Sequence, residues 1–82
     1  MATFMVERQL TGISMEQLAG AQKAAIETAP KHGARYIRSC FVPETQVCRC
    51  LFEGPDRATI ELVQQAAGLP YVSVVEALDL AP

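Results

Sequence analysis

Residues 35–55 read RYIRSCFVPETQVCRCLFEGP, and this stretch decides the fold. Two apolar-rich runs, residues 35–42 and 47–53, flank the short polar turn Pro-Glu-Thr-Gln. Such runs around a turn predict two neighbouring strands. The stretch also holds all three cysteines of the chain, which makes metal binding worth testing.

One helix is predicted before these two strands in the sequence, and a second helix is predicted after them. Ser14 is a strong N-cap candidate, and Gln17 stands at the position that completes a capping box. Pro30 disfavours helical geometry in the residue before it, so this first helix is expected to end at Ala29. A second helix is expected between Asp56, as its N-cap, and Gly68.

Two outer strands complete the order. Residues 3–9 alternate as a strand does, and residues 71–78 form the last apolar run. The order β-α-β-β-α-β is typical of the α+β ferredoxin-like sandwich, in which an antiparallel sheet carries two helices on one face. We expect one domain over residues 1–82, because a chain of this length builds a single modest core.

Parity along the strands assigns side chains to the two faces of the sheet. The side covered by helices is expected to hold Phe4, Val6, Ile37, Phe41, Cys48, Cys50 and Phe52. The open side is expected to hold Met5, Glu7, Arg38, Cys40, Val42, Arg49 and Leu51. Because this open face mixes apolar residues with opposite charges, we expect a symmetric homodimer to bury it. Glu7 and Glu76 would then meet Arg38 and Arg49.

Each helix is expected to bury one stripe of side chains. The first stripe is Met15, Leu18, Ala21, Gln22, Ala25 and Ala29. The second includes Thr59, Leu62, Val63, Ala66 and Ala67. Gly20 lowers the helix propensity of the first segment, and close approach to the sheet would explain it.

The bulk composition excludes several classes of protein. The net charge of −2, with scattered basic residues, argues against nucleic acid. No segment is long enough to span a membrane, and the opening residues lack the pattern of a signal peptide. An odd number of cysteines without such a signal indicates reduced thiols, so we expect a cytoplasmic protein.

The cysteines fall on both faces of the hairpin. Cys48 and Cys50 share a face about 7 Å apart along the strand, a spacing unlike the C-x-x-C of zinc ribbons. Burial as small hydrophobic residues is favoured for this pair over metal or redox chemistry, and both readings stay open. Cys40 lies on the opposite face, where an interface role is favoured because no base accompanies it.

A candidate metal site lies at one end of the sheet. His32 is the single histidine, and the predicted topology puts it at the same edge as Glu53, Asp56 and Asp79. An imidazole among carboxylates suits nickel, or another borderline divalent ion such as zinc. The competing interpretation is that His32 faces the negative end of the first helix and that the acids are simply solvated.

Other constellations give weaker hypotheses. Glu7, Glu16 and Glu44 belong to the opposite edge, where they form a hard-cation cluster or, more simply, ordinary surface acids. The chain has no nucleophile–base pair and no phosphate-binding glycine loop, so no enzyme activity is expected.

The whole chain resembles a family of short bacterial proteins known from a nickel-binding member in streptomycetes. The matching features are MVERQLTG at residues 5–12, YIRS at 36–39, the strand that contains Cys50 and ends before Gly54-Pro55, AAGLP at 66–70 and VEA at 75–77. The resemblance implies a homodimeric ferredoxin-like fold that binds nickel at surface sites and has no established catalysis.

One position departs from that family pattern. Many relatives carry a histidine where this chain has Arg38, so the resemblance leaves His32 and the carboxylates as the favoured ligands. Two alternatives remain. One is a small dimeric α+β-barrel enzyme, such as a monooxygenase or isomerase, with a cavity between helices and sheet. The other is a protein-interaction module that uses the open sheet face.

Overall fold

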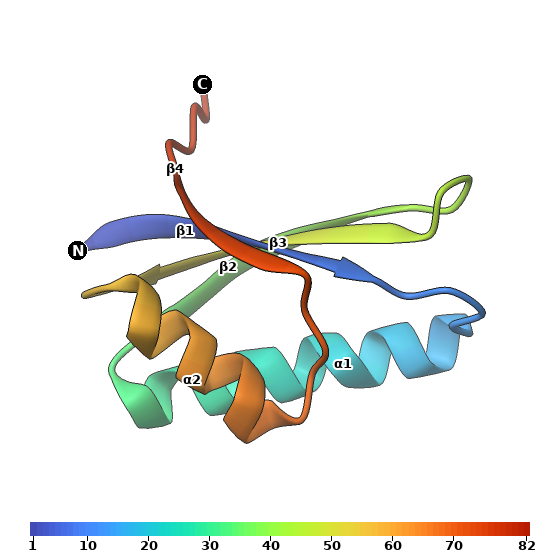
Figure 1. The fold of residues 1–82 in the computed structure, drawn as a ribbon, viewed down its shortest axis with the longest axis horizontal. Coiled ribbons are helices and arrows are strands. Elements are labelled where there is room, and N and C mark those ends of the chain that lie inside the picture. Colours follow the sequence, from blue (N-terminus) through green and yellow to red (C-terminus); the bar gives the residue numbers. More distant parts are fainter.

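The computed structural model describes all of residues 1–82. Its elements follow the predicted order: β1 (Ala2–Gln9), α1 (Met15–Thr28), the 3₁₀ turn η1 (Ala29–His32), β2 (Arg35–Val42), β3 (Val47–Gly54), α2 (Arg57–Ala67) and β4 (Ser73–Ala77). The four strands form one antiparallel sheet in the order β2-β3-β1-β4. Both helices lie on one side of this sheet, and the C-terminal tail leaves on the other side (Figure 1). The predicted ferredoxin-like α+β fold is confirmed.

The helix boundaries follow from local capping. The Ser14 hydroxyl accepts from the Gln17 N–H and the Gln17 side chain accepts from the Ser14 N–H, which completes the predicted capping box. Asp56 accepts from the Thr59 N–H and starts α2, while Gly68 ends it in the left-handed conformation with φ 70°. Residues with L side chains rarely adopt that conformation, so glycine is favoured there.

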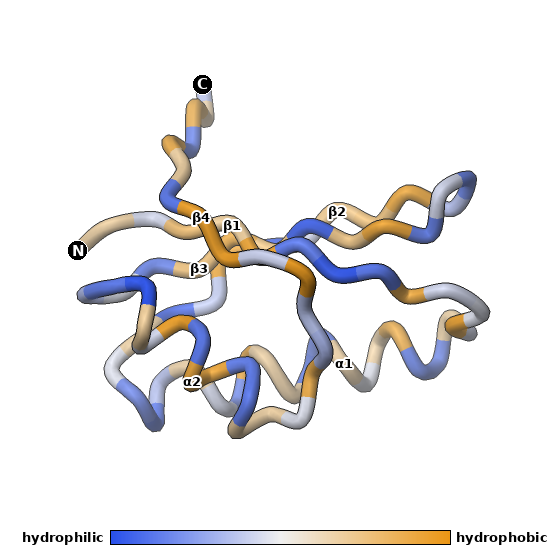
Figure 2. The backbone as a smooth tube through the Cα atoms, in the orientation of Figure 1, coloured by the Kyte–Doolittle hydropathy of each residue, from blue (hydrophilic) through white to orange (hydrophobic).

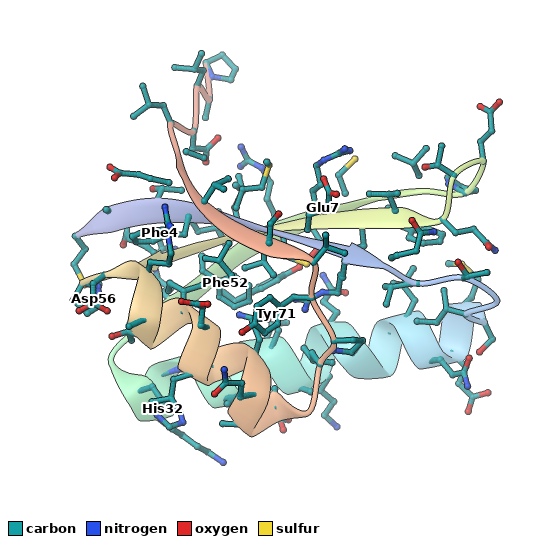
Figure 3. The ribbon with its side chains drawn as sticks, viewed as in Figure 1. Phe4, Glu7, His32, Phe52, Asp56 and Tyr71 are labelled. Carbon is teal, nitrogen blue, oxygen red and sulfur yellow. The ribbon has the colours of Figure 1, made fainter.

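The core fills the space between the sheet and the helices. Phe52, Val6, Ile60 and Val63 are completely buried there. Figure 3 shows Phe52 pointing toward the helices and Glu7 pointing away from them. Both helices alternate between hydrophilic and hydrophobic residues along their length, as expected for helices with one buried face (Figure 2).

A β-bulge in β2 changes one face assignment. Tyr36 pairs with Phe52 and Arg38 pairs with Leu51, which leaves Ile37 as an extra residue between them. Ile37 therefore joins Thr3 and Glu53 on the open side of the sheet, and its predicted place under the helices is wrong. Tyr36 takes the covered position, with its ring edge-to-face against Phe52 at a centroid distance of 5.5 Å.

The predicted helix stripes need further corrections, because four of their residues are exposed: Met15, Gln22, Leu62 and Ala66. In α2 the buried residues are Ile60, Val63 and Gln64, whereas Leu62 is exposed, because the buried face lies nearer the Ile60–Gln64 side of the helix. In α1 the predicted stripe starts too early, since Met15 is exposed. Gly20 is exposed as well, and a Cβ there would meet nothing within 4 Å, so close packing does not explain this glycine.

No helix of the protein combines the length and the apolar character needed to cross a bilayer.

Candidate functional site

The end of the sheet that was predicted to hold a metal is formed as expected. Arg35, at the start of β2, pairs with Glu53, at the end of β3. Thr3, near the start of β1, pairs with both Glu53 and Ala77, so β3 and β4 end at the same edge. His32 ends η1 just before β2, and Asp56 follows β3. Both lie at the same end of the molecule in Figure 3.

Each predicted carboxylate already has a partner within the chain. Glu53 Oε1 lies 3.4 Å from Arg35 Nε, and Asp79 Oδ1 accepts from Arg38. Asp56 Oδ1 accepts from the Thr59 N–H at 2.8 Å, and hydrogen bonding to the Thr59 side chain and to this N–H lowers the pKa of Asp56. Glu53 and Asp79 each use one oxygen in these contacts, and their second oxygens have no hydrogen-bond partner in the protein.

The four predicted ligands do not converge on one point. No group of three or more His, Cys, Asp or Glu side chains is placed to hold a metal ion. Glu53 and Asp79 line a groove of about 670 Å³ together with Arg35 and Ile37, and neither His32 nor Asp56 lines it. The reason is the layering of the fold, since His32 belongs to the helix layer and Glu53 to the sheet.

Glu7, Glu16 and Glu44, the acids expected at the opposite edge, do not form a metal-binding group either. Glu7 Oε1 lies 3.2 Å from Arg49 Nε across the open face of the sheet. Arg49 and Arg38 are therefore paired within the chain, to Glu7 and Asp79 respectively. Glu76 pairs with the buried Phe4 in the register, so parity directs its side chain to the helix side.

The cysteines lie on the faces that parity predicted. Cys48 and Cys50 are buried under the helices with their sulfurs 3.8 Å apart, and Cys40 is exposed on the open face. Burial, together with the neighbouring Cys50, raises the pKa of Cys48 from 9.0 to about 11. Cys48 is therefore a neutral thiol near pH 7, which favours the packing interpretation over metal binding through its thiolate.

A buried arginine lies beside these thiols. Arg8 is only 2% exposed and belongs to the same face of β1 as Phe4 and Val6. Its guanidinium donates to Gln64 Oε1 at 2.8 Å, to the Pro70 carbonyl at 3.1 Å and to Cys50 Sγ at 3.5 Å. None of the three ion pairs of the protein involves Arg8, so this buried charge has no carboxylate partner.

Polar contacts continue from this arginine across the covered face. The Ser39 hydroxyl donates to Cys50 Sγ at 2.9 Å and lies 2.7 Å from the Tyr36 hydroxyl. Gln22, on α1, donates to that Tyr36 hydroxyl at 3.0 Å. A hydrogen-bonded network thus runs from α1 along the covered face of the sheet to Arg8. Every fully buried side-chain nitrogen or oxygen in the protein has a hydrogen-bond partner.

The sequence interpretation missed Arg8 and Gln64, although a signal for each was present. Arg8 stands two residues after Val6 in a predicted strand, so parity alone places it on the covered side. Gln64 stands four residues after Ile60 and next to Val63, which is a buried helical position. Their charge and polarity made both residues look like surface residues.

The arrangement defines a small ferredoxin-like protein with two polar regions. One is a polar rim at one end of the sheet, made of His32, Glu53, Asp56 and Asp79, and the other is the thiol–arginine network beneath the sheet. The chain belongs to the family described as nickel responsive protein SCO4226-like, whose model matches residues 4–77. The predicted family resemblance is confirmed.

A solved structure supports the same relationship. The chain is similar to SCO4226 from Streptomyces coelicolor A3(2), whose crystal structure superposes with a TM-score of 0.86 at 25% sequence identity. The match covers 98% of this chain and 100% of that chain. No curated protein sequence matches this chain.

The buried thiol gives a prediction for alkaline pH. The raised pKa of Cys48 means that the unfolded chain loses this proton near pH 9.0, whereas the folded protein keeps it up to about pH 11. The contribution to stability is therefore present below pH 9 and is lost as pH rises toward 11. Urea unfolding across this range should show a smaller loss of stability in Cys48→Ala than in the parent. Cys40→Ala, which removes the exposed thiol, should retain the parent slope, and equal slopes in all three proteins would contradict the assignment.

Proposed function

We propose that this protein is a cytoplasmic nickel-binding homodimer that holds Ni²⁺ at surface sites and serves metal buffering, storage or response. Membership of the nickel-responsive family is the observation that carries the proposal. The chemistry of the rim supports it, because a neutral imidazole and carboxylate oxygens are ligands that divalent metals of this kind accept. Other divalent ions of similar preference are competitors for the same ligands.

The proposed protein ligands are His32, Glu53, Asp56 and Asp79. Glu53 and Asp79 each keep one oxygen without a protein partner, so either can bind an ion and still retain its present contact. Since no three such side chains converge in one chain, an ion shares at most two of these ligands from that chain. Water, or side chains of a second copy, would complete the coordination.

The proposed dimer interface is the open face of the sheet. Val75, Met5 and Leu51 stand opposite one another in the register and form an apolar row across β4, β1 and β3. The C-terminal tail rises on this same side, and its Leu78 and Leu80 are 83% and 86% exposed (Figure 1). Burial of these side chains against a second copy would be favourable by roughly 25 cal/mol per Å² of apolar surface.

An enzymatic function is not proposed. The cavity beneath the sheet contains thiols, a hydroxyl and a guanidinium, but no carboxylate or imidazole lines it. General acid–base chemistry near neutral pH commonly needs one of those groups.

Calorimetry with Ni²⁺ tests the ligand assignment. His32→Ala should weaken nickel binding at pH 7.5 by at least about tenfold, because it removes the only imidazole. Lys23→Ala is the matched control, since Lys23 is an exposed residue of α1 and not one of the proposed ligands, and it should leave the affinity unchanged. Parent-like affinity in His32→Ala would remove His32 from the site.

Sedimentation velocity tests the dimer. The parent should sediment as a dimer at micromolar concentration, and Val75→Asp should shift it to monomer, because a charge would be buried in the apolar row. Ile26→Asp, on the exposed side of α1, should remain dimeric. A monomeric parent, or a Val75→Asp variant that stays dimeric, would exclude this face as the interface.

A further inference from the structure

The space between the sheet and α1 contains a partly open cavity that the nickel proposal does not use. Its volume is about 140 Å³, and it lies between α1 and the covered face of the sheet. Leu18, Ala21, Ala25 and Phe41 form its apolar walls. The polar groups and thiols that line it belong to Arg8, Gln22, Ser39, Cys48 and Cys50. The cavity thus combines apolar walls with the positive charge of the Arg8 guanidinium.

The charge of Arg8 is not neutralised by any acid of the chain. A guanidinium has five N–H donors, and three hydrogen bonds to Gln64, Pro70 and Cys50 account for three of them. The other two, the Nε–H and one Nη1–H, have no acceptor in the protein. No side-chain nitrogen or oxygen that is fully buried in this protein lacks a hydrogen-bond partner. Since Nε of Arg8 has no partner, this atom is not fully buried and borders open space. A buried cation with a spare donor is a strong attractor for an anion, since charge-assisted hydrogen bonds are about twice as strong as neutral ones.

The other polar groups of the cavity are compatible with a negative charge. The raised pKa of Cys48 keeps its thiol neutral at physiological pH, so it does not repel an anion. Ser39 contributes a neutral hydroxyl, which donates to Cys50 Sγ at 2.9 Å. No Asp or Glu lines the cavity. A metal cation is disfavoured at the same place, because the guanidinium lies 3.5 Å from Cys50 Sγ and repels positive charge.

An access route is present at one side of the cavity. A surface groove of about 640 Å³ lies between the β1–α1 loop and the segment that follows α2. Arg8, Leu10 and Ala21 line both this groove and the cavity. A ligand entering from the groove therefore meets Arg8 at the mouth of the chamber.

We propose that this cavity binds a small organic carboxylate, with its carboxylate on Arg8 and its apolar body between α1 and the sheet. The volume sets the size of that body, because an apolar cavity of about 150 Å³ accepts one benzene ring. The ligand class is therefore a monocarboxylate that carries an aromatic ring or an aliphatic group of similar size. This site is independent of the nickel rim, which uses none of the same residues.

Titration with sodium benzoate, followed by ¹H–¹⁵N NMR of the full chain, tests the proposal. Benzoate should shift the amide signals of residues that line the cavity, with a Kd of about 1 mM or tighter. Benzyl alcohol has the same ring without the charge and should bind at least about tenfold more weakly. Benzylamine should not bind, and sodium chloride at equal ionic strength should cause no comparable shifts.

Two alanine variants of α1 separate the cavity from the surface. Ala21→Leu fills the chamber and its mouth while leaving Arg8 in place, so it should abolish the benzoate shifts. Ala19→Leu adds the same side chain at an exposed position of the same helix and should bind benzoate as the parent does. Equal affinities for benzoate and benzyl alcohol, benzoate binding that survives in Ala21→Leu, or no benzoate shifts up to about 10 mM would each overturn the proposal.

Discussion

The hydrogen bonds of the buried Arg8 guanidinium are the interaction on which the covered side of this protein depends. They join β1 to Gln64 on α2, to the Pro70 carbonyl in the segment before β4, and to Cys50 on β3. Removal of a charge from water costs several kcal/mol unless such partners compensate for it. Both ends of the Gln64 amide are hydrogen-bonded, since its Nε2 donates to the Ile60 carbonyl while its Oε1 accepts from Arg8. The hydrogen bond between Arg8 and Gln64 therefore helps to fix the position of α2 over the sheet.

This constraint separates two kinds of chemistry in a small domain. Soft sulfur ligands, Cys48 and Cys50, are enclosed with a positive charge beside them, which disfavours a metal ion there. Oxygen ligands and the single imidazole lie outside the core, at the end of the sheet where β3 and β4 finish. The proposed nickel ligands and the proposed anion cavity therefore lie in different layers of the fold and share no residue.

Much of the fold was predictable because local signals agreed with one another. The capping residues Ser14 and Asp56 marked where each helix begins, and the hairpin fixed the middle of the sheet. The bulge at Ile37 was not predictable, because parity assumes a regular strand and nothing in the local sequence marks the extra residue. The shared edge of the site followed from topology, but the ion pairs of Glu53 and Asp79 depend on the reach of arginine side chains. Sequence order does not determine that reach.

A double-mutant cycle between Arg8 and Gln64 tests the central role of the buried cation most directly. Gln64→Leu alone removes an acceptor and should destabilise the protein by about 1–3 kcal/mol or more, because the charge stays buried. Adding Arg8→Met should recover part of that loss, so that the double variant is more stable than Gln64→Leu alone. Free energies of unfolding from urea titrations would give the coupling. If the two substitutions add within about 0.5 kcal/mol, Arg8 does not hold α2 through Gln64 and the account is wrong.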